Sequence, residues 1–373
     1  MIDKVRLTTL CRRPALGGTL TALAVLGLAV PAAAEEVKSG NDKVSLALSG
    51  QINRAVLYAD DGDEDEVFYV DNDNSSTRVR FIGKGQFSDN FSVGTQMEVQ
   101  FESNSTASIK MDQTSAAGGS GSFTERKLEF YLDHKNIGRL WLGQGDTASN
   151  GSSEIDLSGA TVIAYSGIAD MMGGLEFGGP GGRQINQAWS NFDGFSRQDR
   201  IRYDTPKFAG FQAKVSAFEA ENDGWDVALT YSNDYGFLKV AAAIAYGETD
   251  AKDQLNGSIS LLHESGISAT FATGERELDV AGDREDPFFW YAKLGYRLHA
   301  FDFGSTRLAI DYGEGDDVAA DDEEIQTFGV FVVQMVDAIA TEFYAGYRNH
   351  SLDVPGSNPD DINGVIAGAR IKF

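Results

Sequence analysis

The sequence predicts an all-β protein, and more specifically a 16-stranded antiparallel β-barrel whose strands cross a membrane. Three observations lead to this fold class. Apolar and polar residues alternate along many segments, the periodicity of amphipathic helices is nearly absent, and short and long connections alternate between the segments. An alternation with a period of two places successive side chains on opposite faces of a strand, so each predicted strand separates two environments.

The clearest predicted strand is the segment 91–103, FSVGTQMEVQFES. Its odd-numbered positions are mostly apolar, and its even-numbered positions carry Ser, Gln and Glu. The segments 44–53, 225–233 and 362–373 follow the same rule. Each signal is short, so the prediction depends on how often the pattern recurs along the chain.

The connections between these segments alternate in length. Short turns are predicted at 88–90, 135–138, 205–210, 232–236, 263–266, 299–304 and 334–338. Longer acidic or Gly/Ser-rich loops are predicted near 59–66, 104–122, 147–196, 220–224, 247–254, 273–286, 313–324 and 349–361. An even number of strands with short turns at one end and long loops at the other is typical of outer-membrane barrels. Both termini then lie at the short-turn end, where the first and last strands can pair and remove the open edges.

The apolar face of these strands meets lipid rather than a protein core. A soluble sandwich would have loops of similar length at both ends. The polar faces carry Lys, Arg, Glu and Gln at consecutive positions, which favours a water-filled lumen. Aromatic residues lie near strand ends, as in the aromatic girdles of membrane barrels; they are Phe91, Phe101, Trp225, Tyr231, Trp290 and Phe373.

The N-terminal residues 1–34 are predicted to be a signal peptide that is cleaved, and residues 35–373 to be the barrel. Four basic residues precede an apolar run at 15–30, and PAAAEE supplies small residues for cleavage after Ala34. The apolar run is shorter than the ~20 residues of a spanning helix. The single cysteine, Cys11, lies in this segment, so the mature chain has neither thiols nor disulfides.

The charge of the chain excludes a nucleic-acid partner. The net charge is −25, and it becomes more negative once the basic signal segment is removed. A nucleic-acid binder would have the opposite balance. The acids cluster in 59–66 and 314–324, which predicts that these segments are loops exposed to solvent. Carboxylates also suit Ca²⁺, but neither run has the order of a calcium loop.

No catalytic, cofactor or metal motif is found. The four histidines lie in turns or at strand ends, and no two have the spacing of metal ligands. The glycine-rich stretch 178–182 lacks the Lys-Ser/Thr of a phosphate-binding loop. The sequence therefore predicts a protein that is not an enzyme, with an outer-membrane hydrolase assembled only by the fold as the open alternative.

The loop at 147–196 is the most informative segment. A connection of this length in a compact domain is usually functional or disordered. It carries Ile163, Tyr165, Met171, Phe177 and Trp189, among other apolar residues. These side chains need a surface to bury against, and the inside of a wide barrel provides one. We therefore predict that the loop folds inward, the alternative being an exposed flexible loop.

The stretch 164–179, AYSGIADMMGGLEFGG, resembles the third-loop constriction motif of the general, non-specific Gram-negative porins. In that family an Asp and the Glu of a Pro-Glu-Phe-Gly-Gly run line the narrowest part of the pore. The resemblance assigns these acidic roles to Asp170 and Glu176. Leu175 stands where the family often has Pro, and about two extra residues separate the acids.

The resemblance also assigns a basic wall opposite the loop. RFIGKG at 80–85 is similar to the second-strand motif of the family, which gives Arg80 and Lys84 this role. Arg78 shares their face by parity, Lys127 in ERKLEFYL matches the next basic position, and Arg197 is the candidate after the loop.

Further family features concern assembly. RIRYDTPKFAGF at 200–211 resembles the family, and the terminal Phe373 fits the aromatic residue that the barrel-assembly machinery recognises. The resemblance implies an outer-membrane protein of Gram-negative bacteria that assembles as a homotrimer. Outer-membrane lipid and lipopolysaccharide are then expected partners.

Together these observations predict a water-filled channel for the passive diffusion of small hydrophilic solutes and ions. The excess of acids predicts cation selectivity, although charge on outer loops is screened beyond ~8 Å at physiological salt. Two alternatives stay open at this point. One is a substrate-specific channel with a binding site built by the long loop, and the other is a plugged barrel with a structural or adhesin role.

Overall fold

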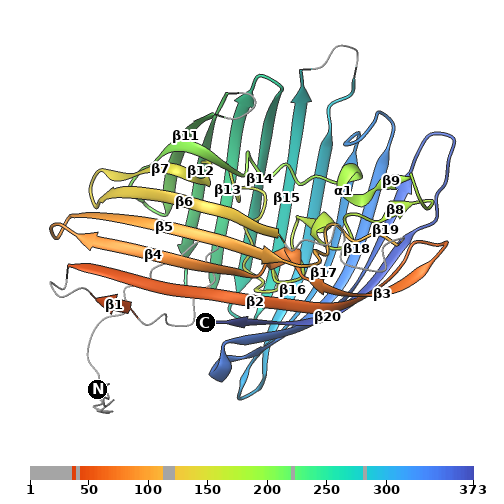
Figure 1. Ribbon diagram of the computed structural model, residues 1–373, viewed down its shortest axis with the longest axis horizontal. Coiled ribbons are helices and arrows are strands. Elements are labelled where there is room, and N and C mark those ends of the chain that lie inside the picture. The colour runs from red at the N-terminus through yellow and green to blue at the C-terminus, as the bar shows by residue number, and fades with distance from the viewer. Residues whose placement is uncertain (1–35, 39–42, 112–121, 220–222, 280–283) are drawn as a thin grey trace, which may run out of the picture.

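The structure is a computed structural model that describes residues 36–38, 43–111, 122–219, 223–279 and 284–373. Almost all regular structure in these residues is β-strand, arranged as a closed antiparallel barrel (Figure 1). No helix in the described part of the chain is long and apolar enough to cross a membrane. The predicted signal peptide, 1–34, lies outside the described residues.

The strands and short helices have the following bounds. The first part of the chain contains β1 (Glu36–Lys38), β2 (Val44–Asp60), β3 (Asp65–Asp71), η1 (Asp73–Ser75), β4 (Arg78–Gln86), β5 (Phe91–Glu102), β6 (Ser122–His134) and β7 (Gly138–Asp146). The loop after β7 contains η2 (Ile168–Asp170), β8 (Glu176–Phe177), β9 (Arg183–Gln184) and α1 (Ile185–Ala188). The remaining elements are β10 (Arg197–Asp204), β11 (Phe211–Glu219), β12 (Gly224–Asp234), β13 (Leu238–Thr249), β14 (Lys252–His263), β15 (Ile267–Leu278), β16 (Phe288–Phe301), β17 (Gly304–Asp316), β18 (Glu324–Val336), η3 (Asp337–Ile339), β19 (Thr341–Asp353) and β20 (Ile362–Lys372).

The barrel closes between its first and last long strands. β2 pairs with β20 over ten residues, from Gln51 opposite Lys372 to Asp60 opposite Asn363. Gly50 and Phe373 exchange backbone hydrogen bonds of 2.7 and 3.0 Å, which extend this seam to the C-terminus. Closure satisfies the backbone groups of both edges, as a bilayer demands.

The barrel has sixteen strand positions, as the sequence predicts. β3 and β4 share one position, because both pair with β2, over its second and first halves respectively. Residues 72–77 interrupt this position, and Asn72 donates a hydrogen bond of 2.9 Å to the carbonyl of Val162 in the loop 147–196. The short β1 pairs only with the beginning of β2.

The alternation of side chains agrees with the prediction that the apolar face meets lipid. Large apolar residues on one face of the strands are exposed, whereas their neighbours in sequence are buried inside. Examples of the exposed set are Leu46, Leu48, Met97, Phe130, Ile201, Leu229, Ile244, Leu294, Val330 and Ile371. Each large side chain left in water would forfeit roughly 1.5–3 kcal/mol of burial free energy, so this belt suits hydrocarbon.

The seven short turns lie within a few residues of their predicted places, and they define the short-turn end of the barrel. Some predicted long loops are shorter than expected. β13 and β14 run to Thr249 and from Lys252, so most of 247–254 is strand, and β12 begins at Gly224. Strand pairing continues beyond the apolar belt because acidic side chains in water do not prevent a ladder of backbone hydrogen bonds.

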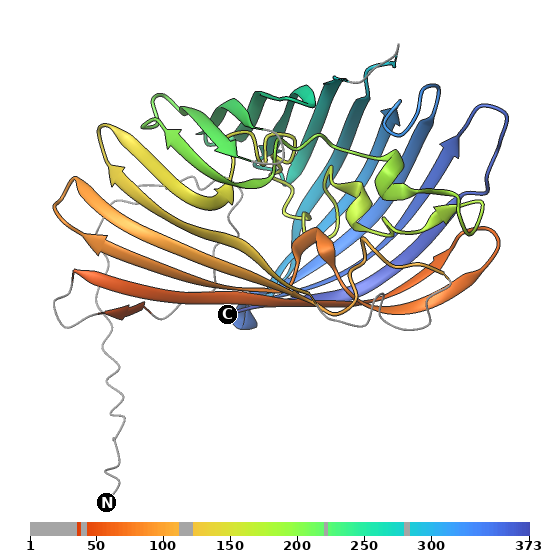
Figure 2. The ribbon, with the colours of Figure 1, turned by 45° about the horizontal axis from the view of Figure 1, so that its top comes forward.

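A hydrophobic core lies inside the barrel, on the side of β15–β20, β2 and β3. Its side chains come from the inner faces of these strands and from the loop 147–196. Figure 2 shows the loop, with its short helices, inside the curve of the strands. The loop contributes Val162, Ile163, Ile168, Met171, Met172, Leu175, Phe177, Trp189 and Phe192 to this core. One side of the interior is therefore filled with protein.

Candidate pore constriction

The loop 147–196 runs from the end of β7 to the start of β10 and is bound to the inner wall of the barrel. Near its start, the backbone N–H groups of Ala148 and Ser149 donate to the carboxylate of Asp226 on β12, at 3.2 and 2.9 Å. The N–H of Ile155 donates to Ser258 Oγ on β14, at 3.0 Å. Backbone polar groups of a buried loop need such partners.

Two charged contacts hold the middle of the loop. Lys293 of β16 donates to the carbonyl of Ala164 at 2.6 Å and pairs with Asp156 at 2.5 Å. Both side chains of this ion pair are almost fully buried. An ion pair removed from water in this way is stable only while both partners stay together, so it fixes the loop at this position.

The second half of the loop packs through apolar side chains. Trp189 and Phe192 both make edge-to-face contacts with Phe289 of β16, with centroid distances of 5.9 and 5.4 Å. Met172 lies so close to β20 that a Cβ at Gly364 would be 2.2 Å from its sulfur. Trp189 and Met172 are among the apolar loop residues whose burial the sequence predicts, and Phe192 joins them.

Asp170 ends the helix η2 and lies near the basic wall. Tyr165 donates a hydrogen bond to its carboxylate, and Thr106 donates to its carbonyl at 2.5 Å. Burial and the charge of Asp73 raise the pKa of Asp170 to about 8, and the nearby Arg126 acts in the opposite direction. The loop thus brings this predicted acid into the field of a wall arginine.

Glu176 is held in a different environment, in the hairpin of β8 and β9. Its carboxylate accepts hydrogen bonds from Gln184 Nε2 at 3.0 Å and from the N–H of Gly181 at 2.6 Å. Lys110 of the loop after β5 forms an ion pair with it at 3.3 Å. These hydrogen bonds, with Lys110, lower the pKa of Glu176. Among the described residues its charged partner comes from another loop and not from the basic wall.

Arg78 and Arg80 lie together on β4, as expected for residues two positions apart on one strand. Both approach Glu98 of β5, with Arg80 Nε at 2.6 Å and Arg78 Nη1 at 3.5 Å from the carboxylate. A third base, Arg126 of β6, donates to the same carboxylate at 2.8 Å. Glu98 is 1% exposed. Three arginines sharing one buried acid leave an excess of positive charge on this wall.

Lys127 and Arg197 form a second group beside the first. Both pair with Asp146 at the end of β7, Arg197 at 4.0 Å. Electrostatic coupling connects Arg197 with Arg126 and with Glu154 of the loop. The two groups therefore adjoin, and the charge of the loop acid Glu154 acts on Arg197.

Lys84 lies apart from these groups. It is also on β4, opposite Ser45 of β2 and Gly94 of β5, close to the turn at 87–90. Six residues of extended strand separate it from Arg78, which is about 20 Å at ~3.3 Å per residue. Lys84 is exposed and belongs to the short-turn mouth of the barrel.

Sequence reasoning missed Arg126 and Glu154. Because successive side chains of a strand alternate, an inward Lys127 predicts an outward Arg126. A β-bulge between β5 and β6 instead places both side chains on the inner face. Glu154 carries no motif; Asn191 donates to it at 3.0 Å. Burial and the charge of Asp193 raise the pKa of Glu154.

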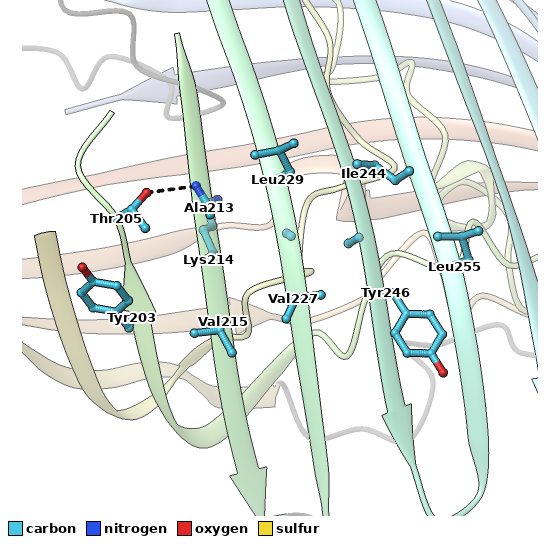
Figure 3. Close-up of a pocket in the computed structure, with 12 residues that line it drawn as sticks. Tyr203, Thr205, Ala213, Lys214, Val215, Val227, Leu229, Ile244, Tyr246 and Leu255 are labelled. Atoms are coloured by element: carbon cyan, nitrogen blue, oxygen red, sulfur yellow. Dashed lines mark hydrogen bonds between the residues drawn. The ribbon is translucent and has the colours of Figure 1, made fainter. Parts of the chain in front are cut away.

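Among the described residues, one group of acids has the spacing of metal ligands, and one large hollow lies outside the lumen. The acids Glu314, Asp316 and Glu324 at the long-loop end come within 4.8 Å of one another, but nothing else there indicates an ion. A hollow of about 580 Å³ lies on the outer face of β10–β14 (Figure 3). Its lining is almost wholly apolar, for example Val215, Leu229 and Ile244, so it belongs to the lipid-facing surface.

The fold and this interior define the class of protein, a transmembrane β-barrel with a loop inside it. Residues 19–354 match the family model described as Gram-negative porin. The chain therefore belongs to the Gram-negative porin family, and it is an outer-membrane porin channel. No curated protein matches the chain.

Three solved structures with the same fold illustrate the likeness. The anion-selective porin from Comamonas acidovorans is 16% identical, covers 89% of this chain and 100% of its own, and has a TM-score of 0.62. In vitro folded OmpT of Vibrio cholerae in its trimer form is 13% identical, with 89% and 100% coverage and a TM-score of 0.59. OmpF of Salmonella typhi in complex with daunomycin is 15% identical, with 91% and 100% coverage and a TM-score of 0.58.

Proposed function

We propose that the protein forms a water-filled channel through which small hydrophilic solutes and ions diffuse passively, with a constriction between the loop 147–196 and the wall of β4, β6 and β10. The observation that carries the proposal is the electrostatic opposition of loop acids and wall bases. Asp170 couples to Arg126, and Glu154 couples to Arg197.

This opposition explains how a pore without catalytic residues selects its solutes. Acids on one side and bases on the other produce a field across a narrow aqueous passage. A polar solute can orient its dipole along that field, whereas a lipophilic solute must displace ordered water without compensation. The acidic role of Glu176 and the basic role of Lys84 are part of this proposal, as the family resemblance implies.

For ions, we propose cation selectivity. The net charge of −25 supports it, and the loop acids Asp170, Glu154 and Asp193 add negative charge once the pH exceeds their raised pKa values. Charges of one sign on low-dielectric walls raise the local concentration of the opposite ion.

Anion preference is the second candidate, and a specific observation favours it. Arg78, Arg80 and Arg126 share the single acid Glu98 on the wall of the proposed passage. The acids of the chain lie mainly in outer segments such as 59–66 and 314–324, where salt screens them.

Planar-bilayer recording in a salt gradient tests the function and decides between the two selectivities. We expect stepwise insertion of ohmic channels. The sign of the reversal potential should show that cations are more permeant than anions. The opposite sign would replace cation by anion selectivity. Saturable block by one solute class would favour a substrate-specific channel. Silence from a folded barrel would reject the channel in favour of a plugged, structural role.

We further propose a homotrimer in a bilayer of lipid and lipopolysaccharide, with Phe373 as the residue that the barrel-assembly machinery recognises. The exposed apolar belt and the position of Phe373 at the seam support this. Triplet closing steps in the bilayer recording and a three-chain mass by native mass spectrometry are the expected results. Deletion of Phe373 should lower the yield of folded barrel in cells.

A further inference from the structure

Two arginines face each other inside the barrel, on other strands than the wall of the proposed constriction. Arg297 of β16 and Arg307 of β17 are direct partners in the register of these strands. Their sequence neighbours Tyr296 and Leu308 are exposed on the outer face, so both arginines point inward. Like charges directly opposite each other destabilise a sheet, which makes this pair unusual unless an anion offsets it.

The contacts of the two guanidinium groups leave donors unused. Arg297 Nη2 donates to the carbonyl of Leu157 at 3.0 Å, and Arg307 Nη1 donates to that of Gly159 at 2.7 Å. These acceptors are neutral. Within the described residues, no group binds Nη1 of Arg297 or Nη2 of Arg307, and the buried Nε atoms of both arginines also lack partners.

One carboxylate serves three bases here. Glu342 of β19 lies 3.8 Å from Arg307 Nη1, accepts from Arg370 Nε at 2.5 Å and accepts from Lys372 Nζ at 3.1 Å. Arg370 and Lys372 both belong to β20 and so complete the same stretch of wall. One acid beside three bases leaves an excess of positive charge between lipid and the loop, where screening by water is weak, although the charge of Asp337 also acts on Arg307.

The cluster lies at the short-turn mouth of the barrel. β17 begins at Gly304 and β19 at Thr341, and β20 ends at Lys372, so each base is a few residues from a strand end. The dense acidic segments lie at the opposite, long-loop end. This cluster of bases therefore lies at the mouth away from the dense acidic segments.

We propose that Arg297, Arg307 and Lys372 form a binding site for the phosphate groups of small solutes at the short-turn mouth. Arginine presents a planar fork of donors that matches phosphate oxygens, and a multivalent anion offsets the excess charge better than chloride does. The site lies on other strands than the proposed constriction. The proposal rests on the proposed function, because a solute can reach this site only through a water-filled lumen.

The competing explanation is structural, with Arg297 and Arg307 serving only to hold the loop through its carbonyls. Lys372 separates the two explanations. Its one ion-pair partner in the described chain is Glu342, and it makes no hydrogen bond to the loop. Lys372→Gln therefore removes charge from the proposed site and leaves the anchoring of the loop intact.

The test measures block of single-channel potassium chloride current by inorganic pyrophosphate added to one side of the bilayer, and then to the other. We expect concentration-dependent block that is stronger from one side. Arg297→Gln and Arg307→Gln should each weaken it about tenfold, the loss of one charge-assisted contact. Lys372→Gln should weaken it severalfold. Lys239→Gln, at an inward lysine of β13 that pairs with Asp234, is the matched control and should change little.

Equal block from both sides, or block unchanged in Lys372→Gln and in both arginine variants, would overturn the proposal. Phosphorus NMR of pyrophosphate with the detergent-solubilised barrel gives a readout that needs no current. If the wild type is silent in the bilayer, the proposed channel function fails, while line broadening lost in Arg307→Gln would still support the anion site. Lack of broadening in the wild type would reject the site by itself.

Discussion

Lys293 of β16 and Asp156 of the loop 147–196 form an ion pair of 2.5 Å, with side chains that are 1% and 3% exposed. The same lysine donates to the carbonyl of Ala164. One wall residue thus binds two points of the loop, and Arg297 and Arg307 bind its carbonyls on the same side of the barrel. On this side of the lumen, specific polar contacts therefore hold the loop against the barrel wall.

Lys293→Met should release the middle of the loop. It leaves the buried carboxylate of Asp156 without its charged partner and with hydrogen bonds from Ser158 and Thr270 alone, which costs about 3–5 kcal/mol. We expect noisier and larger single-channel currents and a lower unfolding temperature. Lys239→Met, at an ion pair with Asp234 that is about half exposed to the lumen, is the control. Unchanged conductance and unfolding temperature in Lys293→Met would show that the apolar packing around Trp189 holds the loop alone.

At a pH above about 8, where its carboxyl is ionised, Asp170→Asn should reduce cation preference, because it removes a negative charge that acts on Arg126. Glu176→Gln should have a smaller effect, since Lys110 already pairs with that carboxylate. Reversal potentials of both variants in the same salt gradient provide the comparison. A larger shift in Glu176→Gln would place the narrowest part of the passage at the β8–β9 hairpin instead.

The selectivity should depend on pH. Burial and Asp73 raise the pKa of Asp170 to about 8, so this carboxyl is neutral below that pH and negative above it. The pKa of Glu154 is raised as well, and its ionisation acts in the same direction. Cation preference should therefore increase as the pH rises through about 8. The increase should be smaller in Asp170→Asn, and a decrease with rising pH would contradict the assignment.

Arg126→Gln should shift the preference toward cations, because it removes one of three bases around Glu98 while Arg80 still satisfies the carboxylate. Arg126→Lys preserves the charge and should behave like the wild type. Lys84→Glu should shift the preference in the same direction but less, since Lys84 lies at the mouth. Equal reversal potentials for Arg126→Gln and Arg126→Lys would remove Arg126 from the ion path.

The sequence alone determined the barrel and its lipid-facing surface. Alternation with a period of two is a local property of each strand, so residues such as Leu46 and Leu48 indicate their face without knowledge of any partner. The alternation of short and long connections likewise predicted the number of strands and placed the termini at one end. The bounds of 147–196 as a connection between β7 and β10 also follow from these local signals.

Only the tertiary structure decided which charges meet inside the barrel. A bulge turned Arg126 inward against its parity, and the path of the loop placed Asp170 near the wall and Glu176 beside Lys110. The arginine pair of β16 and β17 depends on the register of two strands, and its shared acid comes from a third. Side-chain alternation predicts the face of a residue except at a bulge. Its neighbour across the lumen depends on register, bulges and the course of a loop, which are set by packing between distant segments.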